Sequence, residues 1–179
     1  MHLLSLAPAS LHALRSALLE QRGMDAVPLL QQAGYATGDA LFDTLARTLA
    51  DEGAPPPDQL PPEAFAMRVG AFLQASGWGR VALGPDDEAA DPRALVVTVD
   101  DGPESTDDDT PDDGCPLTTG VLSGLLTRVV DAPVAVMAID NGADGTSRRC
   151  RFLAASPATV QAAWQAIAEG RDWRTAVRR

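Results

Sequence analysis

The chain of 179 residues is long enough to bury the core of one domain, and its formal net charge of −11 comes without a single lysine. An anionic surface of this kind repels phosphate backbones, which argues against general nucleic-acid binding. No apolar run approaches the ~20 residues of a membrane span, no leader peptide is visible, and two cysteines cannot build a disulfide framework, so we expect a single cytoplasmic domain over residues 1–179.

The composition also limits which residues can fill the core. Hydrophobic residues make up 45% of the chain but aromatic residues only 4%, so Ala, Leu and Val must fill most of the interior. A pocket in such a core is expected to be aliphatic.

Residues 1–52 are expected to be helical. The stretch Gly-Tyr-Ala-Thr-Gly at 34–38 reads as a link between two helices, because glycines at both of its ends favour a break. Tyr35 within it is a candidate for a pocket wall, and an ordinary connection residue is the alternative. Apolar spacing places three helices in this part of the chain, over residues 10–22, from residue 28 and from residue 38.

Residues 53–62 hold five prolines and no apolar period, which predicts a stiff connector. The next helix, over residues 62–76, carries Phe65 and Phe72 on its apolar side, and Trp78 follows directly. If the domain holds an apolar cavity, we expect these three aromatic side chains at its edge.

The α/β part of the chain is expected over residues 63–170. Residues 78–83 and 94–99 read as two strands, joined by a loop that carries Pro and Asp residues. Acidic residues then crowd the loop over 100–114, and low hydrophobicity with like-charge repulsion predicts that it is mobile.

A broad apolar stripe predicts a buried helix over residues 117–130. Gly120 and Gly124 lie one turn apart on it, and each costs roughly 1 kcal/mol relative to Ala in a helix interior. Their presence indicates that another backbone, or a ligand, approaches closely. Packing and a pocket wall are the two interpretations.

The chain closes with two strands joined by an Asn-Gly turn, a helix and an Arg-rich tail. On the second of these strands, Cys150 and Phe152 are expected to face one side, and Arg151 and Leu153 the other. These elements fall at residues 134–139, 149–154, 156–170 and 171–179. The tail and the acidic loop are expected to be solvated, and docking of a partner is the alternative.

The order of elements indicates the fold class. Helices come first, then two strands, a helix, two more strands and a last helix. This order predicts an α+β domain in which the N-terminal helices, with further helices, pack on a mainly antiparallel four-stranded sheet.

The segment from Cys115 to Phe152 resembles a known family. A cysteine opens a Gly-x-x-x-Gly-Leu-Leu helix, and a strand, a Gly-containing turn and a Cys-Arg-Phe strand follow. This order is similar to the C-terminal half of the 4-vinyl-reductase domain family, of which the chain looks like a divergent member. The stretches 34–38 and 77–79 are further landmarks, so the resemblance spans most of the chain.

The resemblance implies a fold and a function. The family includes a protein tied to bacteriochlorophyll synthesis and the sensory domains of aromatic-responsive activators, and it shares its fold with vesicle-tethering TRAPP subunits. Some members hold a structural zinc with three cysteines and a glutamate. Cys115 and Cys150 match two of those cysteines, whereas Ala138 and Asn141 stand where the other two ligands belong. Asp140, or Asp144 if the turn is shifted by a residue, is the candidate third ligand, and a pair of buried cysteines without metal is the competing interpretation.

Two functions remain open. The first is a non-catalytic binding domain for an apolar, aromatic or tetrapyrrole-like molecule, whose pocket draws on Tyr35, the three aromatic residues 65, 72 and 78, and the two glycines of the buried helix. It would act as a sensor or accessory protein through a partner. The second is a scaffold or assembly subunit with a filled core. Homodimers or a protein partner are expected under either, and a reductase role lacks support because no nicotinamide or flavin motif is found.

Overall fold

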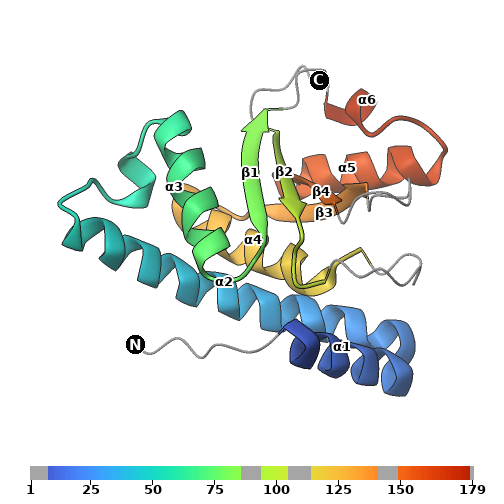
Figure 1. Ribbon diagram of the computed structural model, residues 1–179. Coiled ribbons are helices and arrows are strands. Elements are labelled where there is room, and N and C mark those ends of the chain that lie inside the picture. Colours follow the sequence, from blue (N-terminus) through green and yellow to red (C-terminus); the bar gives the residue numbers. More distant parts are fainter. Residues whose placement is uncertain (1–7, 86–93, 105–113, 141–148, 178–179) are drawn as a thin grey trace.

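The computed structural model describes residues 8–85, 94–104, 114–140 and 149–177. A long helix runs beneath a small sheet, with shorter helices around it (Figure 1). The elements in chain order are α1 (Pro8–Arg22), η1 (Gly23–Asp25), α2 (Ala26–Asp51), η2 (Pro57–Gln59), α3 (Pro62–Ala75), β1 (Arg80–Pro85), β2 (Leu95–Asp100), α4 (Pro116–Val130), β3 (Ala135–Asp140), β4 (Arg149–Ala155), α5 (Pro157–Ala168) and α6 (Arg174–Val177).

The four strands form one antiparallel sheet in the order β1-β2-β4-β3. β4 is therefore an inner strand, and its register sets Cys150 opposite Val99 and Phe152 opposite Ala138. Each strand lies within two residues of its predicted bounds. The α+β class, with helices packed on an antiparallel four-stranded sheet, is confirmed.

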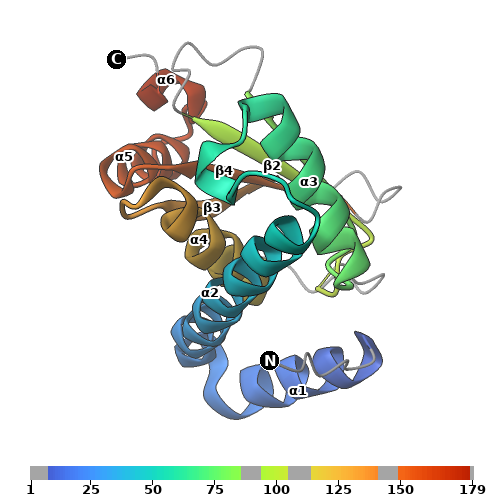
Figure 2. The same ribbon diagram turned by 90° about the vertical axis from the view of Figure 1, so that its left-hand side faces the viewer.

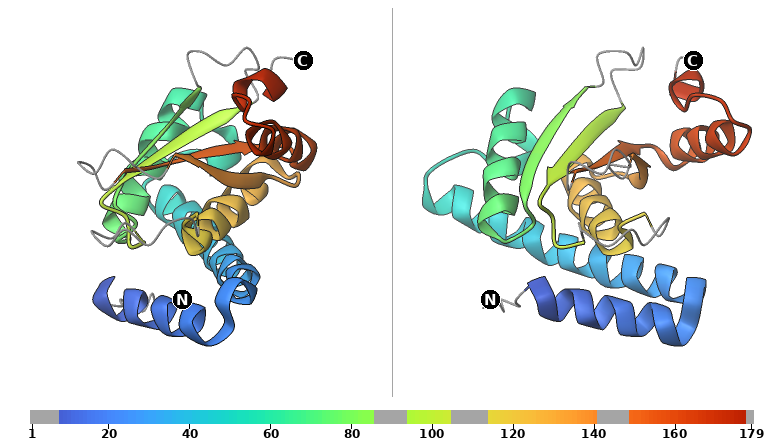
Figure 3. Two further views of the ribbon diagram at one scale, coloured as in Figure 1. Left: turned by 90° about the vertical axis from the view of Figure 1, so that its right-hand side faces the viewer. Right: turned by 45° about the vertical axis from the view of Figure 1, so that its right-hand side comes forward.

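Helices cover the sheet on both faces (Figure 2). On one face, α2, α3 and α4 enclose the main core, to which β4 contributes Cys150, Phe152 and Ala154. On the other face, α5 and α6 enclose a smaller core around Leu153 (Figure 3). The side-chain alternation predicted for β4 is thus confirmed, because neighbouring residues of this strand enter different cores.

The predicted break at residues 34–38 is wrong. α2 continues through it as one helix of 26 residues, with Gly34 and Gly38 buried in its interior. Both glycines keep helical dihedrals, because neither has a positive φ. Glycine permits a break without requiring one, and here a close neighbour explains its presence.

Two smaller expectations also change. The C-terminal tail is not wholly solvated, because α6 and the turn before it bury Trp173 and Val177 against the second core. The proline-rich connector contains the short η2, in which Pro57 is buried. Residues 105–113 of the acidic loop and the Asn-Gly turn at 141–142 lie outside the described residues. Within the described ranges, no helix is both long and apolar enough to cross a membrane.

Candidate functional site

Two pairs of glycines bring α2 and α4 into backbone contact. A Cβ placed on Gly34 or Gly38 would lie within 2.5 Å of a carbonyl oxygen of α4, and one placed on Gly120 or Gly124 would lie as close to a carbonyl oxygen of α2. The contact is reciprocal, and we call these four residues the glycine crossing. At this separation Cα–H groups meet carbonyl oxygens directly.

The glycine crossing helps to bury α4 inside the molecule. Every residue from Pro116 to Leu126 except Ser123 is buried, because α2 covers one side of the helix and the sheet covers the other. The close approach expected at Gly120 and Gly124 is therefore that of the α2 backbone. A ligand contact at these two glycines stays a prediction.

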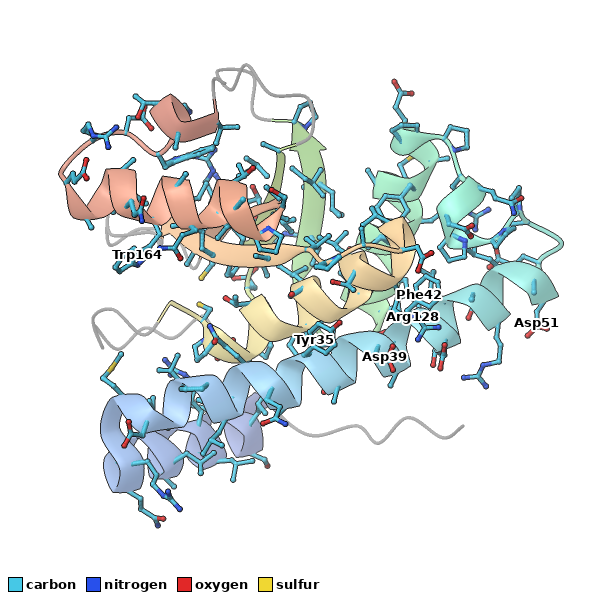
Figure 4. The ribbon with its side chains drawn as sticks, turned by 180° about the vertical axis from the view of Figure 1, so that it is seen from behind. Tyr35, Asp39, Phe42, Asp51, Arg128 and Trp164 are labelled. Atoms are coloured by element: carbon cyan, nitrogen blue, oxygen red, sulfur yellow. The ribbon has the colours of Figure 1, made fainter. Side chains whose placement is uncertain are left out.

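Arg128, near the C-terminal end of α4, joins this helix to α2 at an exposed position. Its guanidinium donates hydrogen bonds to Asp39 and to Asp43, the latter at 3.1 Å, and lies 4.6 Å from the centroid of the Phe42 ring. The hydrogen bond to Asp39 raises the pKa of Arg128. Figure 4 shows Asp39, Phe42 and Arg128 together where α4 passes α2. Tyr35 lies beside α4 on this side of the molecule with 44% of its surface exposed.

Three of the aromatic residues predicted for a pocket pack against the main core. Phe65 and Phe72 of α3 and Trp78, two residues before β1, all pack against the main core, and each is only partly buried. α3 approaches β1 closely, because a Cβ on Gly70 would lie 2.5 Å from the carbonyl oxygen of Val81. All three rings thus border the main core, and we call these three residues the aromatic group. Tyr35 is not part of it.

The two cysteines meet at the start of α4. Cys115 precedes the helix in the left-handed region, with φ +51°, and its Sγ lies 3.2 Å from that of Cys150. Both residues are buried, and neither is part of a disulfide. The hydrogen bond with Cys150, and then burial, raise the pKa of the Cys115 thiol well above its usual range, so the thiol keeps its proton.

A buried carboxylate holds the first turn of α4. Glu104 accepts hydrogen bonds from the backbone N–H groups of Leu117 at 3.1 Å and Thr118 at 2.6 Å. These groups have no partner within the helix, and the positive end of the helix dipole favours a carboxylate there. Arg15 of α1 faces Glu104, with 3.6 Å between its Nε and Oε1, and both side chains are almost fully buried. This pair ties α1 to the start of α4.

The described side chains do not fit a structural zinc site. Zinc in such sites takes four ligands, and within the described part of the chain no group of three or more His, Cys, Asp or Glu residues converges. Two thiols meet, and the carboxylate of Glu104 is engaged by backbone N–H groups. The side chain of Asp140 lies outside the described part, so its role as a ligand stays a prediction.

Sequence analysis missed two features of this region. Gly34 and Gly38 share the four-residue spacing of Gly120 and Gly124, so pairing the two motifs would have indicated a close helix crossing. Glu104 is the only glutamate among the aspartates of the acidic segment at 100–114. That difference weakly indicated a separate role for Glu104.

Comparison with known proteins shows the fold. No protein-family model matches the chain, and no curated protein matches it in sequence. The crystal structure of the phenol-responsive sensory domain of the transcription activator PoxR with phenol aligns with a TM-score of 0.67 at 15% identity, over 100% of this chain and 85% of that chain.

A second similar structure comes from Naegleria fowleri. It is a trafficking protein particle complex subunit 3 covalently bound to palmitic acid, with a TM-score of 0.60 at 14% identity, over 83% of this chain and 91% of that chain. Identities this low establish the shared fold alone. It is the fold that the sequence resemblance implied.

Proposed function

We propose that this chain is a divergent member of the 4-vinyl-reductase domain family that binds a small apolar molecule, aromatic or tetrapyrrole-like, without catalysing a reaction on it. The domain passes the signal to a partner protein, as a sensor or accessory subunit. Support comes from the fold shared with a phenol-responsive sensory domain and with a subunit that carries a palmitoyl chain. Both ligands are apolar or aromatic, which favours the same ligand class here.

The observation that carries the proposal is the aromatic group. Large aromatic side chains are scarce in this chain, yet Phe65, Phe72 and Trp78 all pack against the main core and stay partly uncovered. Apolar ligand sites are lined mainly by hydrophobic and aromatic side chains. We therefore assign the ligand contact to this group.

A thermal-shift measurement tests the assignment. Phenol, palmitate and a free porphyrin are the probes, and a bound ligand stabilises the native state by about 2.7 kcal/mol at 100 times its Kd. For a chain of this size that corresponds to a rise in Tm of about 5–11 °C. We expect one of the three probes to give such a shift.

A pair of variants on α3 locates the contact. Phe72→Leu keeps an apolar side chain and should weaken the responding probe at least tenfold, whereas Met67→Ala removes a side chain that is 72% exposed on the same helix and should leave binding unchanged. The shift is measured within each variant, so altered stability of the free protein does not enter. Equal binding by both variants would move the site away from the aromatic group.

The alternative is a scaffold or assembly subunit with a filled core. The glycine crossing favours it, because the two backbones touch and leave no ligand space between α2 and α4. Native mass spectrometry of the protein separates the two functions. A dimer or a protein complex that carries no small molecule, together with no thermal shift from any probe, would support the scaffold.

A further inference from the structure

The two thiols are arranged for a reaction with each other. The Sγ atoms of Cys115 and Cys150 lie 3.2 Å apart, and a disulfide bond is 2.03–2.05 Å long, so they need to approach by about 1.2 Å. The residues are 35 positions apart in sequence, and they come from different elements. The fold, and not local chain geometry, has brought them together.

Both backbones around the thiols are well held. Cys150 lies in the inner strand β4, paired with Val99 of β2. Cys115 stands directly before α4, whose first turn is fixed by the buried Glu104. The carbonyl oxygen of Cys115 accepts a hydrogen bond from the N–H of Thr119 at 2.9 Å. With both backbones held, the remaining distance has to be closed mainly by rotation of the two side chains. The cysteines are 8% and 6% exposed, so a small oxidant has limited access.

We propose that Cys115 and Cys150 form a reversible dithiol–disulfide couple that small hydroperoxides oxidise slowly. One thiol gives up its proton as its sulfur attacks a peroxide oxygen. The O–O bond breaks, the sulfur becomes a sulfenic acid, and the leaving oxygen takes up the proton and departs as an alcohol or water. The second thiol attacks that sulfur, the S–S bond forms and the S–O bond breaks, releasing water. Two thiols and one hydrogen peroxide thus give one disulfide and two waters, and a dithiol reductant reverses the change.

The disulfide would tie the start of α4 to the centre of the sheet. A cross-link over this separation restricts the unfolded chain, so the oxidised protein should be more resistant to heat. We expect its Tm to rise by about 5–15 °C relative to the reduced protein. The native fold should change little, because the sulfurs already face each other.

Intact mass spectrometry after exposure to hydrogen peroxide is the test. We expect a loss of two mass units with two free thiols consumed, and recovery of both thiols in dithiothreitol. Trypsin should release one cross-linked product, because Cys115 falls in the peptide of residues 94–128 and Cys150 in the dipeptide of residues 150–151. The rise in Tm should accompany the mass change.

Single variants supply the controls. Cys115→Ser and Cys150→Ser each keep one thiol, and neither should show the loss of two mass units or the rise in Tm. Three results would overturn the proposal: addition of oxygen to both sulfurs without a cross-link, a cross-link between two chains, or thiols that react only after denaturation. Stoichiometric zinc released from the native protein by a thiol reagent would overturn it as well.

Discussion

Replacing Gly124 by alanine tests the glycine crossing most directly. In an isolated helix this change stabilises, because alanine is better than glycine in a helix interior by about 1 kcal/mol. In this molecule the new Cβ would lie within 2.5 Å of the carbonyl oxygen of Tyr35, and 3.1 Å and 3.2 Å from its C and Cα atoms. The gain in helix propensity and the steric clash therefore change the free energy of unfolding in opposite directions.

The structure indicates which effect is larger. A carbon atom meets a carbonyl oxygen at ~3.3 Å or more, so the helices must part by about 1 Å. The neighbour is backbone of a buried helix pair and cannot rotate away. Overpacking costs about 1–3 kcal/mol and lies at the upper end for a rigid neighbour. After the gain in helix propensity, we expect Gly124→Ala to lower the free energy of unfolding by about 2 kcal/mol.

Urea denaturation, followed by tryptophan fluorescence, measures this change, and Tm should fall by about 4–8 °C. Ala36 is an exposed position of α2 near the crossing and provides the controls. Ala36→Gly should destabilise by about 1 kcal/mol through propensity alone, and Ala36→Leu should stay within ~0.5 kcal/mol of the parent chain. A Gly124→Ala protein as stable as the parent, or more stable, would refute the close contact.

Two further predictions concern the start of α4. The folded thiol of Cys115 has a raised pKa, so it keeps its proton at pH values where the unfolded thiol, with pKa ~8.5, loses it. The contribution to stability is therefore full below pH ~8.5, and above it the free energy of unfolding should fall by up to ~1.4 kcal/mol per pH unit. Urea titrations at several pH values measure this slope, which should be absent from Cys115→Ala. Glu104→Gln weakens a buried ion pair and a helix cap and should lower the free energy of unfolding by about 2–4 kcal/mol. Asp101→Asn breaks the exposed pair with Arg80 and should cost less than ~1 kcal/mol in the same assay; equal losses would show that burial does not set the strength of these pairs.

Local patterns in the sequence were sufficient for most of the fold. Each strand is short and bounded by turn residues, so its position follows from local signals. Apolar periodicity likewise located α1, α3, α4 and α5. These signals depend on near neighbours in the chain, and no distant contact is needed to read them.

The errors came where a distant segment decides the local structure. Gly34 and Gly38 read as a break because local propensity favours one, and only the presence of α4 explains the continuous helix. The burial of Trp173 and Val177 depends in the same way on a sheet face that a linear reading does not show. The meeting of Cys115 with Cys150 was anticipated through the family resemblance, whereas their separation of 3.2 Å required the structure.

The long distance in sequence between α2 and α4 has a consequence for the order of folding. Arg128 contacts Asp39 across 89 positions, so α2 cannot find its main partner until most of the chain has been synthesised. Until then the two glycines of α2 weaken an unsupported helix, and its leucines lack a core. Contacts of high sequence separation slow folding and leave apolar surface uncovered meanwhile. The N-terminal half of this protein is thus the part that most depends on protection during its synthesis.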